Sequence, residues 1–206
     1  MKASLLFLSF ILIGLGSIAQ RISGSVSGVE KLESASRTLE TLPSGVFFFE
    51  GFDNVLIPQL PSGWTTYSSG TEAFLSGTSG NLSGQTNENG FWPVPLHGLY
   101  AFTNDDVCNC DKSFDLLTSK TFDLSQQTYV RLGFSSFQNG SGGQTVSVQV
   151  KQELGSWTSL ELIPSSAEWR NQSIDIPAEH LTKGFQFRFK YNDNGNYASG
   201  FAIDDI

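Results

Sequence analysis

Apolar and polar residues alternate along several stretches of the chain with a period of two. Valines alternate with polar residues over 146–151, and aromatic residues do so over 185–191. Shorter stretches follow the same pattern at 130–134 and 174–176. Successive side chains of a strand point to opposite faces of its sheet. Each stretch is therefore predicted to be a strand with one face on a core.

Clusters rich in glycine, asparagine and serine separate these predicted strands, at 139–143, 154–156 and 192–195. Such clusters are typical of the turns between antiparallel strands. One short helical turn is predicted over 177–183, closed by Gly184. Strands with this spacing and these turns predict an all-β fold, a two-sheet antiparallel β-sandwich.

The first 19 residues have the pattern of a secretory signal peptide. A lysine at position 2 precedes an apolar run over 5–13, and small residues stand at 17 and 19. The alternative is a transmembrane anchor, for which the run is short, since a span takes about 20 residues. We therefore predict a signal peptide over 1–19 and a secreted or cell-surface protein that keeps no membrane span after cleavage.

The mature chain is predicted to have two parts. Residues 20–45 are rich in serine, glycine and threonine and are interpreted as a flexible leader. A single domain is predicted over 46–206, opening with a buried strand at Val46–Phe49. Residues 65–90 are mostly Ser, Gly, Thr and Asn, which predicts a long excursion from the sandwich and a candidate binding loop.

Composition limits the classes of partner. The 206 residues include 39% apolar residues and 17 Phe, enough for one domain with a substantial core. The formal net charge is −8, and no run of Lys or Arg occurs. Because a nucleic-acid-binding surface must neutralise phosphates, nucleic acid is not expected as a partner.

Several short motifs occur in a fixed order along residues 46–206. They are Phe49-Glu50-Gly51-Phe52-Asp53, Leu60-Pro61-Ser62-Gly63-Trp64, Asp115-Leu116-Leu117-Thr118-Ser119, Phe122-Asp123-Leu124-Ser125, Gly155-Ser156-Trp157-Thr158 and Gly200-Phe201-Ala202-Ile203-Asp204-Asp205-Ile206. This set resembles the MAM-like jelly-roll modules of secreted Bacteroidetes proteins, known as choice-of-anchor J or cleaved-adhesin domains. The resemblance implies an extracellular jelly-roll sandwich, usually non-catalytic, often attached to peptidases or adhesins. It also implies that the last strand continues beyond Ile206, so the domain is predicted to be truncated there.

A calcium site is predicted where the two ends of the domain meet. Glu50 and Asp53 lie near its start and Asp204 and Asp205 at its end, and the first and last strands of a sandwich are commonly neighbours. Converging carboxylates repel one another unless a cation lies between them, and calcium prefers oxygen ligands. The resemblance likewise implies calcium at these segments. Adjacent strand residues point to opposite faces, so we expect one of the two final acids to bind and the other to be solvated. The alternative is that all four are ordinary surface acids.

The segment 103–115 contributes further candidates. Asn104 and Asp105 are expected to donate oxygens to the calcium site from a neighbouring loop, although loop acids are usually only solvated. Cys108 and Cys110 stand two residues apart, which favours either a loop disulfide or buried thiols. Zinc is not expected, because the site would need at least two more nitrogen or sulfur ligands.

Exposed aromatic residues are candidates for ligand binding. Phe91 and Trp92 precede a proline at the end of the long excursion, and aromatic rings there could stack on a sugar or a protein ligand. The alternative is that Trp92 packs into the end of the sandwich, since large aromatic side chains are mostly buried.

Catalysis has no motif behind it, because neither a G-x-S-x-G elbow nor an H-E-x-x-H pair occurs. We therefore expect a secreted, non-catalytic, adhesin-like module that binds an extracellular protein or glycan and holds structural calcium. Two alternatives stay open at this stage. One is an accessory domain of a secreted peptidase, and the other is a glycosidase-like jelly roll, since carboxylate pairs are plentiful.

Overall fold

The computed structural model describes most of the predicted domain. The described residues are 45–79, 92, 94–108, 110–140 and 142–206, without the side chains of residues 107 and 108. The predicted signal peptide and all but the last residue of the predicted leader lie outside the described residues.

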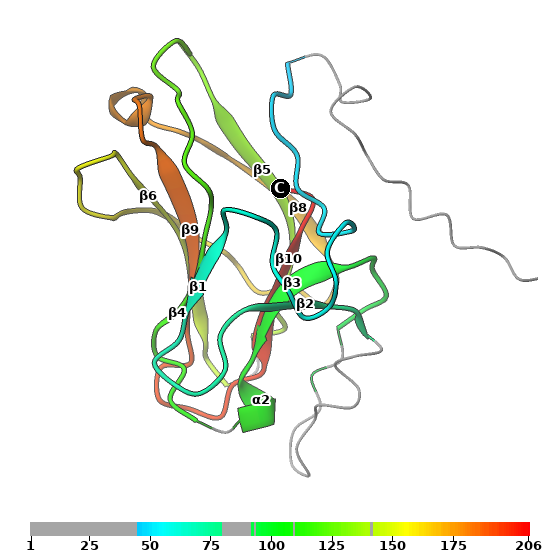
Figure 1. Cartoon of the computed structure of the whole chain (residues 1–206). Helices are drawn as coiled ribbons and strands as arrows, with labels where there is room; N and C mark the ends of the chain where they lie inside the picture. Colours follow the sequence, from blue (N-terminus) through cyan, green and yellow to red (C-terminus); the bar gives the residue numbers. More distant parts are fainter. Residues whose placement is uncertain (1–44, 80–91, 93, 109, 141) are drawn as a thin grey trace, which may run out of the picture. The chain divides into compact units, whose positions relative to one another are not determined.

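The described chain forms an all-β jelly-roll sandwich of two antiparallel five-stranded sheets (Figure 1). The first sheet has the strand order β1(Thr65–Tyr67), β4(Asp115–Thr118), β9(Gln186–Asn192), β6(Thr145–Lys151), β7(Thr158–Leu162). The second has the order β2(Leu75–Gly77), β3(Tyr100–Asn104), β10(Gly200–Asp204), β5(Arg131–Phe137), β8(Arg170–Asp175). The fold class predicted from the alternating pattern is thus confirmed.

Two short helices complete the described elements, α2(Asp105–Cys108) and the 3-10 helix η2(Ala178–His180). The second lies inside the predicted helical turn, and Gly184 follows it with a φ of +68°. A side chain at Gly184 would also meet Glu153, so glycine suits the position both for its backbone angle and for space.

The main core fills the space between the sheets. In the register of β6 and β9, Val148 lies opposite Phe189 and Val150 opposite Phe187, and all four side chains are buried. Alternate residues of the same strands face outward. The strict alternation over 146–151 and 185–191 therefore predicted correctly which side of the first sheet faces the core.

A second apolar cluster covers the outer side of the second sheet. Its buried members are Trp92, Val94, Tyr100, Phe102, Phe137 and Ala202. In contrast, Phe201 and Ile203 of the same strand β10 belong to the main core. Strands β3 and β10 are consequently buried along their whole length, on both faces.

Two segments differ from their predictions. Val46 and Phe47 are 42% and 51% exposed and belong to no strand, because the backbone pairing of this segment begins only at Glu50, which bonds to Ile206. The predicted excursion over 65–90 contains two strands, β1 and β2, before its undescribed part begins. No helix within the described residues is long and apolar enough to cross a membrane.

Candidate functional site

The end of strand β10 carries a cluster of two carboxylates and an imidazole. His97 Nε2 lies 2.9 Å from Asp204 Oδ2 and 3.9 Å from Asp205 Oδ2. Both acids therefore reach the same imidazole although they are adjacent in sequence, while which of them binds a cation stays a prediction. Asp205 has a φ of +49°, which ends the regular strand and turns its carboxylate to the side of Asp204. One ligand atom from each of the three residues lies within 4.8 Å of the others, close enough for a shared metal ion.

Burial and hydrogen bonding shape the charges of this cluster. Burial raises the pKa of Asp204 to about 6, against the opposing effect of its hydrogen bond with His97. That hydrogen bond, in turn, is the main cause that raises the pKa of His97. The second oxygen of Asp204, Oδ1, is buried and has no hydrogen-bond partner within the described residues. A buried carboxylate oxygen without a partner is a position that a cation would satisfy.

Glu50 and Asp53 lie at the same end of the domain. The backbone N–H of Glu50 donates to the carbonyl of Ile206 at 2.8 Å, which places the first acid beside the last residues. Asp53 Oδ1 lies against the backbone at Gly98, next to His97, whose pKa the Asp53 charge helps to raise. Burial raises the pKa of Glu50, and its Oε1 accepts the N–H of Phe52. The structure thus clusters Asp204 and Asp205 with His97, while Glu50 and Asp53 lie at the same end of the domain outside that cluster, so their part in a calcium site stays a prediction.

Asn104 and Asp105 lie elsewhere, so their predicted place in the calcium site is wrong. In the register of β3 and β10, Asn104 is opposite Gly200, whereas Ala101 is opposite Ile203. The two candidates therefore lie at the far end of β10 from Asp204. Asp105 Oδ2 accepts the backbone N–H of Ala198 at 2.9 Å, and burial raises the Asp105 pKa to about 6.

The remaining predicted site residues are the two aromatic residues and the two cysteines. Trp92 is 1% exposed and stacks on Phe137 at 6.1 Å between ring centroids, so the prediction that it is an exposed ligand anchor is wrong. Phe91 lies outside the described residues. Cys110 is disulfide-bonded, whereas the side chain of Cys108 is not among those described, so their pairing stays a prediction.

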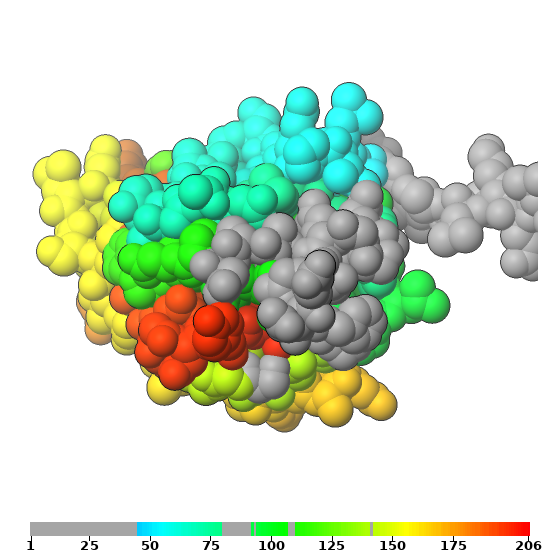
Figure 2. Space-filling model, turned by 90° about the horizontal axis from the view of Figure 1, so that it is seen from below, coloured from blue at the N-terminus to red at the C-terminus, as the bar shows by residue number. Residues whose placement is uncertain are grey.

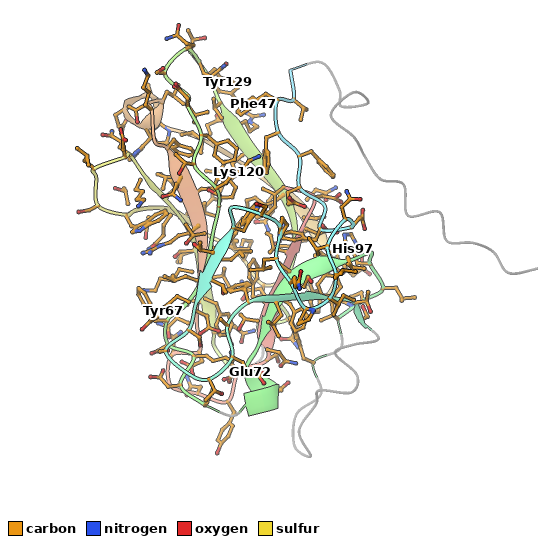
Figure 3. The ribbon with its side chains drawn as sticks, viewed as in Figure 1. Phe47, Tyr67, Glu72, His97, Lys120 and Tyr129 are labelled. Atoms are coloured by element: carbon orange, nitrogen blue, oxygen red, sulfur yellow. The ribbon has the colours of Figure 1, made fainter. Side chains whose placement is uncertain are left out.

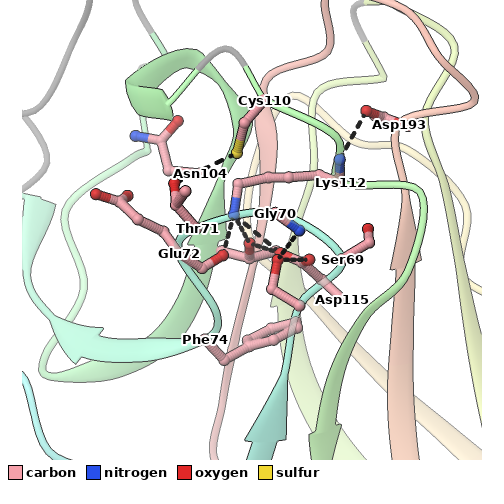
Figure 4. A network of polar contacts seen from close by, with 12 residues as sticks. Ser69, Gly70, Thr71, Glu72, Phe74, Asn104, Cys110, Lys112, Asp115 and Asp193 are labelled. Atoms are coloured by element: carbon pink, nitrogen blue, oxygen red, sulfur yellow. Dashed lines mark hydrogen bonds and ion pairs between the residues drawn. The ribbon is translucent and has the colours of Figure 1, made fainter.

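A buried polar network closes the opposite end of the sandwich (Figure 4). Lys112 Nζ donates to Asp115 Oδ2 at 3.0 Å, to Thr103 Oγ1 at 3.1 Å and to the carbonyl of Glu72. Its backbone N–H donates to Asp193 Oδ2. Seen from this end, the β9–β10 connection (orange-red) lies beside the green segment that contains residues 110–115, and the turquoise segment that contains residues 68–74 lies on the other side of it (Figure 2). Every group of the network has a partner, so we interpret it as a structural tie between three loops.

Aromatic rings and positive charges lie side by side on the outer face of the first sheet. The following residues make up what we call the aromatic–cationic face: Tyr67, Phe114, Lys151, Trp157, Arg188 and Lys190. Tyr67 and Lys190 share this side of the sheet because both are register partners of Leu116. Tyr67 is 56% exposed and Phe114 36% exposed. Figure 3 shows Tyr67 beside β1, well separated from His97.

The rings and cations of this face contact one another directly. The guanidinium carbon of Arg188 lies 4.1 Å from the centroid of the nearest Trp157 ring and 5.8 Å from that of Phe114. The ammonium groups of Lys190 and Lys151 lie 4.4 Å from Phe114 and 5.1 Å from Trp157, respectively. Tyr67 meets Phe114 edge to face at 6.1 Å. These are the distances of cation–π and aromatic pairs.

Sequence reasoning missed both His97 and the aromatic–cationic face. Arg188 and Lys190 stand at the outward positions of an alternating strand, where charged residues normally face only water. Phe114 and Trp157 precede strands β4 and β7 and have no sequence pattern that places them on the same surface. A search for cations at the outward positions of strands flanked by aromatic residues would have found the region.

No protein-family model and no curated protein sequence matches the chain. Among solved structures, it is similar to the K1 and K3 cleaved adhesin domains of Lys-gingipain from Porphyromonas gingivalis W83. The TM-score is 0.48 in both cases, at 16% and 12% identity, over 77% of this chain and 94% and 96% of those chains. It is also similar to the CBM22-1 xylan-binding domain of Paenibacillus barcinonensis Xyn10C, with a TM-score of 0.46 at 7% identity over 77% and 89%. Cleaved-adhesin domains are therefore among its structural neighbours, while function has to be argued from the residues themselves.

Proposed function

We propose that the chain is a non-catalytic, extracellular module that binds a glycan on its aromatic–cationic face. The observation that supports this most is the exposure of aromatic rings on the outer side of the first sheet, with Tyr67 at 56%. The apolar faces of sugar rings stack on aromatic rings, and the polar edges of sugars bond to neighbouring side chains. Packing in a core accounts for buried aromatic side chains, but it does not account for rings that are exposed to solvent.

The rigidity of this surface also supports binding. Its cations project from the paired strands β6 and β9, and Arg188 is held in place by a 2.7 Å hydrogen bond from its Nε to Gln149 Oε1. Binding costs less ordering entropy where the contact groups are already fixed. A flat, preformed face on a sheet suits an extended oligosaccharide better than a small molecule, which needs a deep pocket.

A glycan array with the purified full chain and matched variants tests this function. We expect Tyr67→Ala and Trp157→Ala each to weaken binding to the captured glycans at least tenfold, because such anchors typically contribute about 2 kcal/mol or more. Tyr197→Ala is the matched control, since Tyr197 is 82% exposed and outside the face. Equal loss in all three variants, or no glycan bound by the unaltered chain, would contradict the proposal.

We further propose that calcium braces the end of the domain at Asp204 and Asp205, with Glu50 and Asp53 of the same end as further candidate ligands. The buried Oδ1 of Asp204, which has no hydrogen-bond partner in the described part of the chain, supports it, as do carboxylate oxygens that suit a hard cation. His97 would then hold the orientation of Asp204 through its hydrogen bond rather than ligate, because calcium prefers oxygen. Calcium would neutralise the mutual repulsion of the carboxylates and link the first segment of the domain to the last.

A further inference from the structure

The positive charges of the aromatic–cationic face indicate which class of glycan would bind there. Building on that function, we propose that the glycan is acidic, a polysaccharide containing uronic acids whose carboxylates bind Lys151, Arg188 and Lys190.

Among the described residues, these three cations have no acidic partner. Within the described residues, none of them has a carboxylate within 4.0 Å, whereas Lys112 and Arg131 are paired with Asp115 and Asp175. The chain as a whole has a formal net charge of −8. A local group of positive charges without a bound carboxylate attracts an anionic ligand even on an acidic protein.

Arg188 is arranged to receive a carboxylate. Its Nε donates a hydrogen bond to Gln149 Oε1, and the Nε2 of Gln149 in turn donates to Ser159 Oγ at 2.9 Å. The two terminal nitrogens of Arg188 have no hydrogen-bond partner among the described residues. Such a pair of parallel N–H groups matches the two oxygens of a carboxylate, and the guanidinium is held flat by the ring of Trp157 at 4.1 Å.

Aromatic rings flank the cations across the sheet, with Tyr67 and Phe114 on one side of Arg188, Lys190 and Lys151, and Trp157 on the other, which suits an extended ligand. Tyr67 belongs to β1 at one edge of the sheet, and Trp157 precedes β7 at the other. Tyr67 contacts Phe114, Phe114 contacts Arg188, and Arg188 contacts Trp157, so the rings and cations form one continuous set of contacts between these edges. An oligosaccharide that crosses the strands can therefore stack its rings on the aromatic residues while its carboxylates reach the ammonium and guanidinium groups between them.

The experiment uses the full chain with oligogalacturonate and with the methyl ester of the same oligosaccharide, which differs only in lacking the charges. Isothermal titration should show at least tenfold tighter binding of the free acid. Binding of the acid should weaken as sodium chloride rises from low to moderate concentration, since exposed charge pairs are screened. Arg188→Gln and Lys190→Gln should each lose most of this preference for the acid.

Arg170→Gln is the control, because it removes the same charge from strand β8 of the other sheet and should change the affinity less than twofold. Thermal melting of every variant separates loss of binding from loss of folding, and Lys190→Gln serves if Arg188→Gln does not fold. Equal binding of acid and ester would overturn the acidic ligand but leave glycan binding intact. Tighter binding of dextran sulfate or of single-stranded DNA at the same face would overturn the carboxylate assignment.

Discussion

The main chains of Glu50 and Ile206 exchange two hydrogen bonds, with N to O distances of 2.8 Å and 2.9 Å. This reciprocal pair joins the start of the described domain to its last residue. It also explains why Glu50 lies at the same end of the domain as Asp204 and Asp205, about 150 positions later in the sequence. The main chain also places the adjacent carboxylates of Asp204 and Asp205 side by side, and their mutual repulsion favours an opposing charge between them.

Calcium should therefore stabilise the protein measurably. An ion that binds only the folded state at a hundredfold excess over its Kd contributes about 2.7 kcal/mol. For a domain of this size, each kcal/mol raises the Tm by about 2–4 °C. We expect calcium to raise the Tm in differential scanning calorimetry, and Asp204→Asn to remove most of the rise. Asp175→Asn, which changes an exposed acid paired with Arg131, should retain the calcium-induced rise in Tm. A Tm that EDTA leaves unchanged would contradict the calcium site.

The His97–Asp204 pair should make the metal-free protein less stable as the pH rises. The folded-state pKa of Asp204, about 6, lies above its ordinary value of 3.8. Its contribution to the free energy of unfolding is therefore fully present below pH 3.8 and is lost as the pH rises to 6. The pKa of His97 is raised from 6.5, and its contribution is lost as the pH passes above that value. In EDTA, His97→Gln should flatten the upper part of the pH dependence of the free energy of unfolding. A stability that increases from pH 6 to 8, with or without His97, would contradict this account.

Removing the side chain of Trp92 should destabilise the fold without affecting ligand binding. The ring fills the second apolar cluster between Phe102 and Phe137, and deletion of a buried Trp leaves a cavity that costs about 3–5 kcal/mol. Chemical denaturation of Trp92→Ala measures the cost, and Tyr197→Ala provides the exposed aromatic control. A loss of affinity in Trp92→Ala at full stability would restore the ligand role that burial argues against.

Replacing Asp105 by Asn should stabilise the protein at neutral pH. Burial raises the pKa of Asp105 to about 6, so an ionised carboxylate is disfavoured there, while the Asn oxygen can still accept the N–H of Ala198. The gain in the free energy of unfolding should be on the order of 1–3 kcal/mol larger at pH 7.5 than at pH 4. Glu168→Gln, at an exposed position, should show no such difference. A loss of calcium binding in Asp105→Asn would instead return this residue to the metal site.

The alternating pattern predicted the half-buried strands but could not show the fully buried β3 and β10, of which only β10 was expected, from the family resemblance, and it also missed the largely exposed β1 and β7. Strands β6 and β9 have one face in the core and one in water, so their residues alternate visibly. Strands β3 and β10 are buried along all five residues, because the cluster around Trp92 covers their outer side. A strand without a wet face has no polar alternation to detect.

Of the candidate site, the sequence predicted only the acids near the two ends of the domain. Glu50 and Asp204 follow from the rule that first and last strands are neighbours. The left-handed backbone of Asp205 and the approach of His97 depend on tertiary packing that no local pattern encodes. The same is true of Phe114 and Trp157, which meet only across Arg188.

The burial of Lys112 has a consequence for the chemical reactivity of the protein. Its side chain is 0% exposed and its ammonium group is enclosed by Asp115, Thr103 and Glu72. An acylating reagent can reach the amines of Lys151 and Lys190 on the folded protein, whereas it reaches Lys112 only when the three loops separate. The rate at which this amine is acylated therefore measures how often that end of the sandwich opens.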